Sequence, residues 1–192
     1  MAATVIIHTT TTGWLNLDAW SETYIAAHWL VTNELPAHEY QSETHHGPLS
    51  QMVLIAAHQL IEIMFFQCVR VITDGNPKQF TKIENKYQNT SFKKALEEWP
   101  EIITGTKFDL TQEPLKSADH LRARRNATVH KRSALTSLEM ARSALFSAVE
   151  ASKAISEHLL GEAGFKYNSV LYKYPLKQEQ WFSQVKLINE AT

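Results

Sequence analysis

The sequence predicts an all-α protein, built as an up-down bundle of helices. Glycine and proline number six each among 192 residues, which is too few for an all-β chain with its many tight turns. Two long helical patterns, at residues 50–72 and 136–160, are joined through short connections and a further helix between them. Helices of that length with short connections favour a bundle.

The N-terminal part, residues 1–48, is expected to be an extension with one helix. Residues 1–12 would form a short strand or a frayed end. Residues 17–31 place apolar side chains at helical spacing and predict a helix. Residues 36–48 contain prolines, a glycine and mostly polar side chains, so a loop is expected there.

Residues 49–160 are expected to form the bundle, and its most apolar helix opens at Ser50 and closes at residues 73–77. This helix is apolar nearly all round, which is typical of a central, buried helix. Polar side chains interrupt the run, so a membrane span is not expected. They are His58, Gln59, Glu62, Gln67 and Arg70.

The second half of the bundle contains three helices in the prediction. An amphipathic helix at residues 90–102 should stop near Pro100. Pro114 suits the first turn of the helix that carries most of the arginines. The last helix would open with a capping box, in which the Thr136 hydroxyl accepts the Glu139 amide, and would close at Gly161.

Residues 161–192 are expected to be a C-terminal tail, with a strand at residues 168–174 and a terminal helix around residues 180–188. The tail aromatics would cover a flank of the bundle or a partner surface, or stack on nucleic-acid bases. They are Tyr167, Tyr172, Tyr174 and Trp181.

The total charge excludes a protein that binds nucleic acid by bulk charge. The net charge is −1 and the isoelectric point is about 6.8, so any RNA affinity must come from a local basic patch. The single cysteine, Cys68, cannot form an internal disulfide and is expected to be a small core residue. The first residues lack the pattern of a signal peptide, and a cytoplasmic protein is expected.

The local basic patch is the segment LRARRNATVHKR at residues 121–132, which holds four of the six arginines. Within it, Arg125, Asn126 and His130 form the pattern R-N-x-x-x-H. Asn126 and His130 share one helix face. Arg125 lies about 140° from His130 around an ideal helix, and its long side chain would reach round to the same anion.

These residue types suit metal-independent cleavage of RNA, with no cofactor. The ribose 2′-OH would attack its own phosphodiester and leave a 2′,3′-cyclic phosphate. Arg125 would grip the phosphate and stabilise its growing charge, His130 would transfer the proton, and Asn126 would position them. One copy supplies one base and no obvious acid, so a homodimer is expected. The flanking RNA would be held by Arg122, Arg124, Lys131 and Arg132.

The segment RRNATVH resembles the R-x4-6-H signature, commonly RNxxxH, of the HEPN superfamily, the higher eukaryote and prokaryote nucleotide-binding domains. Its surroundings are also similar, because an apolar helix with an acid near its middle lies upstream and a long alanine-rich helix follows. The likeness covers about residues 50–160. It implies a four- or five-helix bundle, usually dimeric, with the motif at the dimer cleft.

The resemblance implies two kinds of function. Many members are endoribonucleases of prokaryotic toxin–antitoxin or antiphage defence systems, with an antitoxin or another defence protein as partner. Others are non-catalytic modules that bind RNA, a nucleotide or a protein. A purely structural alternative is a basic helix end, in which Arg125 and His130 interact with the helix dipole.

His58 and Glu62 lie four residues apart on one face of the apolar helix. Burying both has a cost unless they bond each other or a ligand. They would be a satisfied polar pair, or would support the motif, with Glu62 orienting Arg125 or a neighbouring arginine. A third alternative is a haem-dependent dioxygenase, because residues 50–67 look somewhat like a helix of tryptophan 2,3-dioxygenases; His130 would then be the haem ligand.

A metal site in the predicted loop is not expected. Its three histidines lie among polar residues, without cysteines or an H-E-x-x-H helix, so solvated side chains are the simpler interpretation. These histidines are His38, His45 and His46.

Overall fold

The computed structural model describes residues 19–34, 47–76, 78–85, 89–130, 136–177 and 179–186. Within these ranges the chain is mostly helical and contains no β-strand, which confirms the all-α prediction. The predicted strand or frayed end at residues 1–12 lies outside the described residues, as do His38, His45 and His46.

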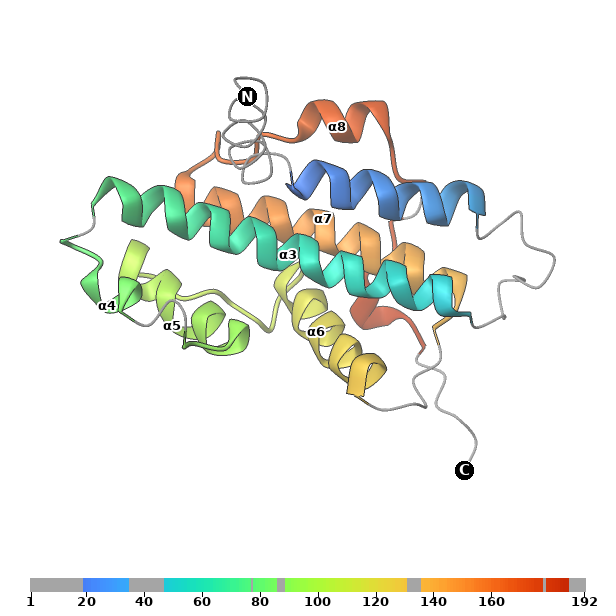
Figure 1. The fold of residues 1–192 in the computed structure, drawn as a ribbon, viewed down its shortest axis with the longest axis horizontal. Helices are drawn as coiled ribbons and strands as arrows, with labels where there is room; N and C mark the ends of the chain where they lie inside the picture. Colours follow the sequence, from blue (N-terminus) through green and yellow to red (C-terminus); the bar gives the residue numbers. More distant parts are fainter. Residues whose placement is uncertain are drawn as a thin grey trace, which may run out of the picture.

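The described helices follow one another in the order shown in Figure 1. The first spans residues 19–29 and continues as the π-helix η1 (Leu30–Glu34). The others are α3 (Pro48–Gly75), α4 (Thr81–Glu84), α5 (Phe92–Thr104), α6 (Leu115–His130), α7 (Leu138–Leu160), α8 (Asn168–Lys173) and the 3-10 helix η2 (Phe182–Gln184).

The two longest helices, α3 and α7, lie side by side at the centre and run in the same direction (Figure 1). The first helix packs on one side of this pair, and α5 and α6 pack on the other. Close approach is possible because α7 turns a row of alanines inward, among them Ala141, Ala144, Ala148 and Ala151, all fully buried. Among the described residues, α3 is the one helix long and apolar enough to cross a membrane by length and composition, and more than half of that stretch is buried inside the fold.

Pro100 does not end its helix, so that prediction is wrong. Proline cannot donate to the carbonyl four residues earlier, yet α5 continues past it to Thr104. Trp99 and Pro100 are both buried, and this packing offsets the missing bond. The stop is Gly105, which adopts a left-handed conformation with φ of 80° and donates its amide to the Glu101 carbonyl.

The N-terminus of α7 is capped one residue later than the sequence pattern predicts. The Ser137 hydroxyl, and not that of Thr136, accepts an amide, from Met140 at 3.1 Å. The Thr136 hydroxyl is buried without a hydrogen-bond partner among the described residues. The predicted end at Gly161 is confirmed, with its amide bonded to the Glu157 carbonyl.

The tail differs most from expectation. The predicted strand at residues 168–174 is wrong, because Asn168–Lys173 forms the short helix α8. The predicted terminal helix is a single 3-10 turn over its described part. Six residues are too few for their apolar pattern to separate a strand from a helix, and packing decides.

The first helix and the tail cover one flank of α7 together, as expected for the tail aromatics. Trp20 donates its indole NH to the Ser152 hydroxyl at 3.1 Å and stacks on Tyr167 with ring centroids 4.6 Å apart. Tyr24 donates its hydroxyl to the Tyr174 carbonyl. Tyr172 is the exception, since it is 90 % exposed.

Candidate functional site

Helix α6 carries the predicted motif and crosses α3 and α7. Its first turn is fixed by the Glu113 carboxylate, which accepts the Ser117 amide at 3.1 Å. Ala118 and Leu121 are buried and hold the helix against the core. The arginines that follow point in different directions from this anchored face, so each meets a different environment.

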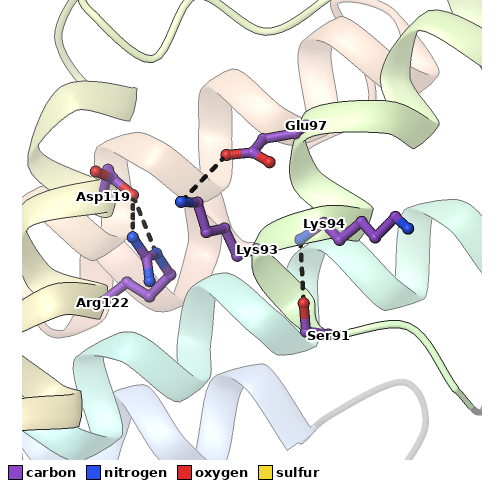
Figure 2. Close-up of polar contacts among 6 residues, drawn as sticks. All are labelled: Ser91, Lys93, Lys94, Glu97, Asp119 and Arg122. Carbon is purple, nitrogen blue, oxygen red and sulfur yellow. Dashed lines mark hydrogen bonds and ion pairs between the residues drawn. The ribbon is translucent and has the colours of Figure 1, made fainter.

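Arg122 is held by an acid of its own helix. Its Nε and Nη2 donate to one carboxylate oxygen of Asp119, at 3.0 and 2.7 Å, and Figure 2 shows this pair beside the start of α5. The i, i+3 spacing of Asp119 and Arg122 is the sequence signal for this pair. Arg122 therefore brings less free charge to the patch than its position suggests.

Arg125 and Asn126 are in direct contact. The Arg125 Nη1 donates to the Asn126 Oδ1 at 3.1 Å, which fixes one edge of the guanidinium. The Arg125 Nε is buried and has no hydrogen-bond partner among the described residues. Two of the three motif residues are thus brought together, and one strong donor remains unused.

His58 and Glu62 come from α3 and lie within the electrostatic reach of Arg125. Burial, with the Arg125 and Arg122 charges, lowers the pKa of His58 to about 4, so its imidazole is neutral near pH 7. Burial raises the pKa of Glu62, while Arg125 acts in the opposite direction. The positive charges on α6 therefore affect the pKa values of His58 and Glu62 on α3.

The His58–Glu62 pair is not a satisfied hydrogen bond. His58 Nδ1 and Glu62 Oε2 are 3.7 Å apart, which is too long for one. The second nitrogen, Nε2, is buried without a partner among the described residues, while the ring packs edge-on against Phe92 of α5. No ion pair joins Glu62 to Arg125 within the described part of the chain, so Glu62 acts on Arg125 through space rather than by contact.

Arg124 points away from this group. It is 9 % exposed, and burial lowers the pKa of its guanidinium. It lines a hollow of about 560 Å³, here named the Arg124 hollow, between α6 and the C-terminal segment. The residues that line this hollow are Asp119, His120, Ala123, Arg124, Ala127, Phe182, Ser183 and Val185.

Hydrogen bonds between residues distant in sequence hold the C-terminal segment over this hollow. The Ser183 hydroxyl donates to Glu113, and the Ser183 amide donates to the Ser117 hydroxyl at 3.1 Å. The Phe182 amide donates to the Ser147 hydroxyl at 2.8 Å. This arrangement could not be predicted from the sequence, because no local pattern links residues that lie 35 to 70 positions apart.

His130 is the last residue of α6, and its side chain lies outside the described part. Lys131 and Arg132 also lie outside the described residues. The convergence of Arg125 and His130 on one anion therefore stays a prediction. No group of three or more metal-ligating side chains occurs among the described residues.

Among the described residues, buried polar atoms without a hydrogen-bond partner are concentrated on the two crossing helices. Those of α3 are Ser50 Oγ and His58 Nε2, and those of α6 include Arg125 Nε and Thr128 Oγ1. Each unmade hydrogen bond on a buried group costs about 1–3 kcal/mol. Arg125 carries a permanent positive charge, so an anion is the ligand that suits it best.

Comparisons of the chain with protein-family models, with characterised proteins and with solved structures find no match. Function is therefore inferred from the chemistry of the α3–α6 crossing and from the motif.

Proposed function

We propose that the chain is a metal-independent endoribonuclease of the HEPN type, which acts at the α3–α6 crossing. The observation that supports this most is the Arg125 side chain. Asn126 holds one edge of its guanidinium at 3.1 Å, and the Arg125 side chain as a whole is only partly buried. A fixed guanidinium with a spare donor is suited to a phosphate, which accepts two parallel hydrogen bonds from arginine.

The proposed reaction is an internal transesterification. The ribose 2′-oxygen forms a bond to phosphorus as the bond to the 5′-oxygen of the next nucleotide breaks. His130 takes the 2′-OH proton, and Arg125 stabilises the charge on the non-bridging oxygens. The leaving 5′-oxygen takes up a proton, and the products are a 2′,3′-cyclic phosphate and a 5′-hydroxyl.

His58 is not a good candidate for either proton. Its pKa of about 4 keeps it neutral near pH 7 and makes it a weak base. Its position within electrostatic reach of Arg125 and Arg122 suits an electrostatic role. Because the imidazole is neutral, it adds no third positive charge that would repel the two arginines. Glu62 offsets part of the arginine charge from the same side.

A second copy of the chain completes the proposal. One histidine cannot serve as base and acid in the same step, so His130 of the partner subunit would protonate the leaving oxygen across a twofold axis. The protein would then act as a homodimer in the cytoplasm, with RNA as substrate and, in a defence or toxin–antitoxin setting, a protein that restrains it.

The test is cleavage of RNA in EDTA by the full chain and by matched variants. His130→Ala and Arg125→Ala should each lower the rate by roughly 10²- to 10⁴-fold, the usual contribution of a proton-transfer group. His120→Ala and Arg142→Ala are the controls. His120 is exposed on the same helix, Arg142 lies on α7, and neither belongs to the proposed site. The end groups should be 2′,3′-cyclic phosphates.

Each other result has a defined meaning. RNA that stays intact with every variant removes the nuclease proposal. RNA that stays intact but is bound, with binding lost in Arg125→Ala, favours the alternative of a non-catalytic RNA-binding module. A haem absorption band in the purified protein would favour the dioxygenase-like alternative instead.

A further inference from the structure

A second hollow lies beyond the α3–α6 crossing, towards the C-terminal end of α3. It has a volume of about 490 Å³ and separates the last turns of α3 from the segment that follows α7. We name it the Cys68 hollow. Figure 1 shows these two parts of the chain beside each other, near the start of the first helix. The size falls within the range of small-molecule sites.

The walls of the Cys68 hollow are mainly apolar. Met64, Cys68 and Val71 come from α3, and Leu160 and Val170 come from α7 and α8. The polar lining residues are Ser21, Gln67, Tyr167 and Ser169, and the Tyr167 hydroxyl donates to the Gln67 Oε1 at 3.1 Å. The walls therefore favour an apolar body.

The hollow is preformed, because its outer wall is anchored. Gly164 lies so close to α7 that an added Cβ would stand 2.5 Å from the Ser156 carbonyl oxygen. Directly after this turn, Phe165 and Tyr167 pack against the buried Trp20. An anchored wall cannot close over the space, so the hollow remains available to a ligand.

Two cations line the hollow, Arg70 and Lys166, and within the described part of the chain one of them forms an ion pair. Arg70 forms an ion pair with Asp74 at 3.5 Å. Lys166 has no acidic partner within the described part of the chain, so the hollow carries a net charge of +1. The positive charge of Lys166 also acts on the buried Cys68 thiol. Burial raises the pKa of the Cys68 thiol to about 12, and Lys166 acts against that rise.

We infer that the Cys68 hollow binds a small apolar molecule that ends in a single carboxylate. The apolar walls would take the hydrocarbon part, and Lys166 would pair with the carboxylate at the rim. This site is separate from the α3–α6 crossing, and the inference does not depend on the proposed nuclease function.

Methionine methyl groups provide a site-specific readout, since the chain has four methionines. Met64 lines the hollow. Met52 lies on the same helix but is 55 % exposed, and twelve residues of helix separate it from Met64, about 18 Å. Met140 is buried in α7. With the full chain labelled at its methionine methyls, decanoate should shift the Met64 signal until it saturates, and leave those of Met52 and Met140 in place.

The charge is tested with head groups and with one variant. Decylammonium should bind at least 5-fold more weakly than decanoate. Lys166→Glu changes an exposed side chain and should weaken decanoate roughly 5-fold, the upper range for a surface ion pair, while uncharged decanol is unaffected. Lys116→Glu, an exposed change on α6, is the control and should alter neither affinity. A Met64 signal that does not move, a response confined to Met52, or equal affinity for decanoate and decylammonium would overturn the inference.

Discussion

Buried polar groups serve different purposes in two regions of the molecule. Along α7, buried serine hydroxyls are used: Ser147 accepts the Phe182 amide, and Ser152 accepts the Trp20 indole NH. Where α3 and α6 cross, the His58 Nε2 and the Arg125 Nε are buried but unpartnered within the described part. In the first region, the buried hydroxyls bind the first helix and the C-terminal segment to α7. In the second region, the buried polar atoms have no hydrogen-bond partner among the described residues.

The difference distinguishes buried polar groups that stabilise the fold from buried polar groups that are suited to binding a ligand. A buried hydroxyl that accepts a hydrogen bond returns most of the cost of its desolvation, whereas an open one does not. The serines of α7 therefore explain how a helix rich in small residues holds two distant segments. The open groups at the crossing lower stability, and a cost of this kind is typical of a site that binds something.

The largest expected effect comes from breaking the satisfied region at Trp20. This side chain is fully buried, stacks on Tyr24 and Tyr167, and bonds to Ser152. Trp20→Ala should lower the free energy of unfolding by about 3–5 kcal/mol, because it leaves a cavity and an unpartnered serine. Urea denaturation followed by circular dichroism measures the change.

The matched control for this variant is Trp29→Ala, at a tryptophan of the same helix that is 56 % exposed. Its cost should stay below about 1 kcal/mol, as for other changes of exposed side chains. Equal costs for the two variants would show that the first helix does not depend on its contact with α7.

The next largest effect is a pH dependence at the open region. His58 has a pKa of about 4 in the fold against 6.5 in the unfolded chain. Between these values the unfolded state binds more protons, so stability is complete above pH 6.5 and falls as the pH drops towards 4. At about 1.4 kcal/mol per pKa unit, the loss is about 3 kcal/mol.

Denaturation of the wild type and of His58→Leu across this pH range isolates the effect. Glu62 has a raised pKa and acts in the opposite direction, but it is present in both proteins. The variant should lose less stability than the wild type as the pH falls. Parallel curves for the two proteins would mean that His58 is protonated in the fold and that its surroundings are more polar than its burial indicates.

The contrast also shows what the sequence can predict. Apolar periodicity was enough to predict α3, α5 and α7, and the i, i+4 spacing was enough to place His58 and Glu62 on one face. Local patterns did not predict which surroundings each arginine of α6 faces. Arg124 and Arg125 are neighbours, separated by about 100° around the helix, and only the distant segment at Phe182 determines that Arg124 faces a hollow.

A smaller effect compares one hydroxyl from each region. Ser147→Ala leaves the buried Phe182 amide without its acceptor and should cost about 1–3 kcal/mol. Thr128→Val removes a hydroxyl that has no partner among the described residues, so its cost should be near zero, within about 0.5 kcal/mol. Urea denaturation of both variants provides the comparison. A clear loss in Thr128→Val would mean that its hydroxyl is bonded after all, and the region would then resemble α7.

The smallest effect tests the same contrast at two adjacent residues. Ser137 caps α7 through the Met140 amide, while the neighbouring Thr136 hydroxyl is buried and has no hydrogen-bond partner among the described residues. Ser137→Ala should cost about 1 kcal/mol, the usual value of an N-cap. Ser137→Thr should retain most of that stability, because it keeps the accepting oxygen. Thr136→Val should cost less than Ser137→Ala in the same denaturation experiment, since it replaces an unused hydroxyl with a methyl group of similar size. The reverse order would restore the capping box that the sequence predicts, with Thr136 rather than Ser137 as the cap.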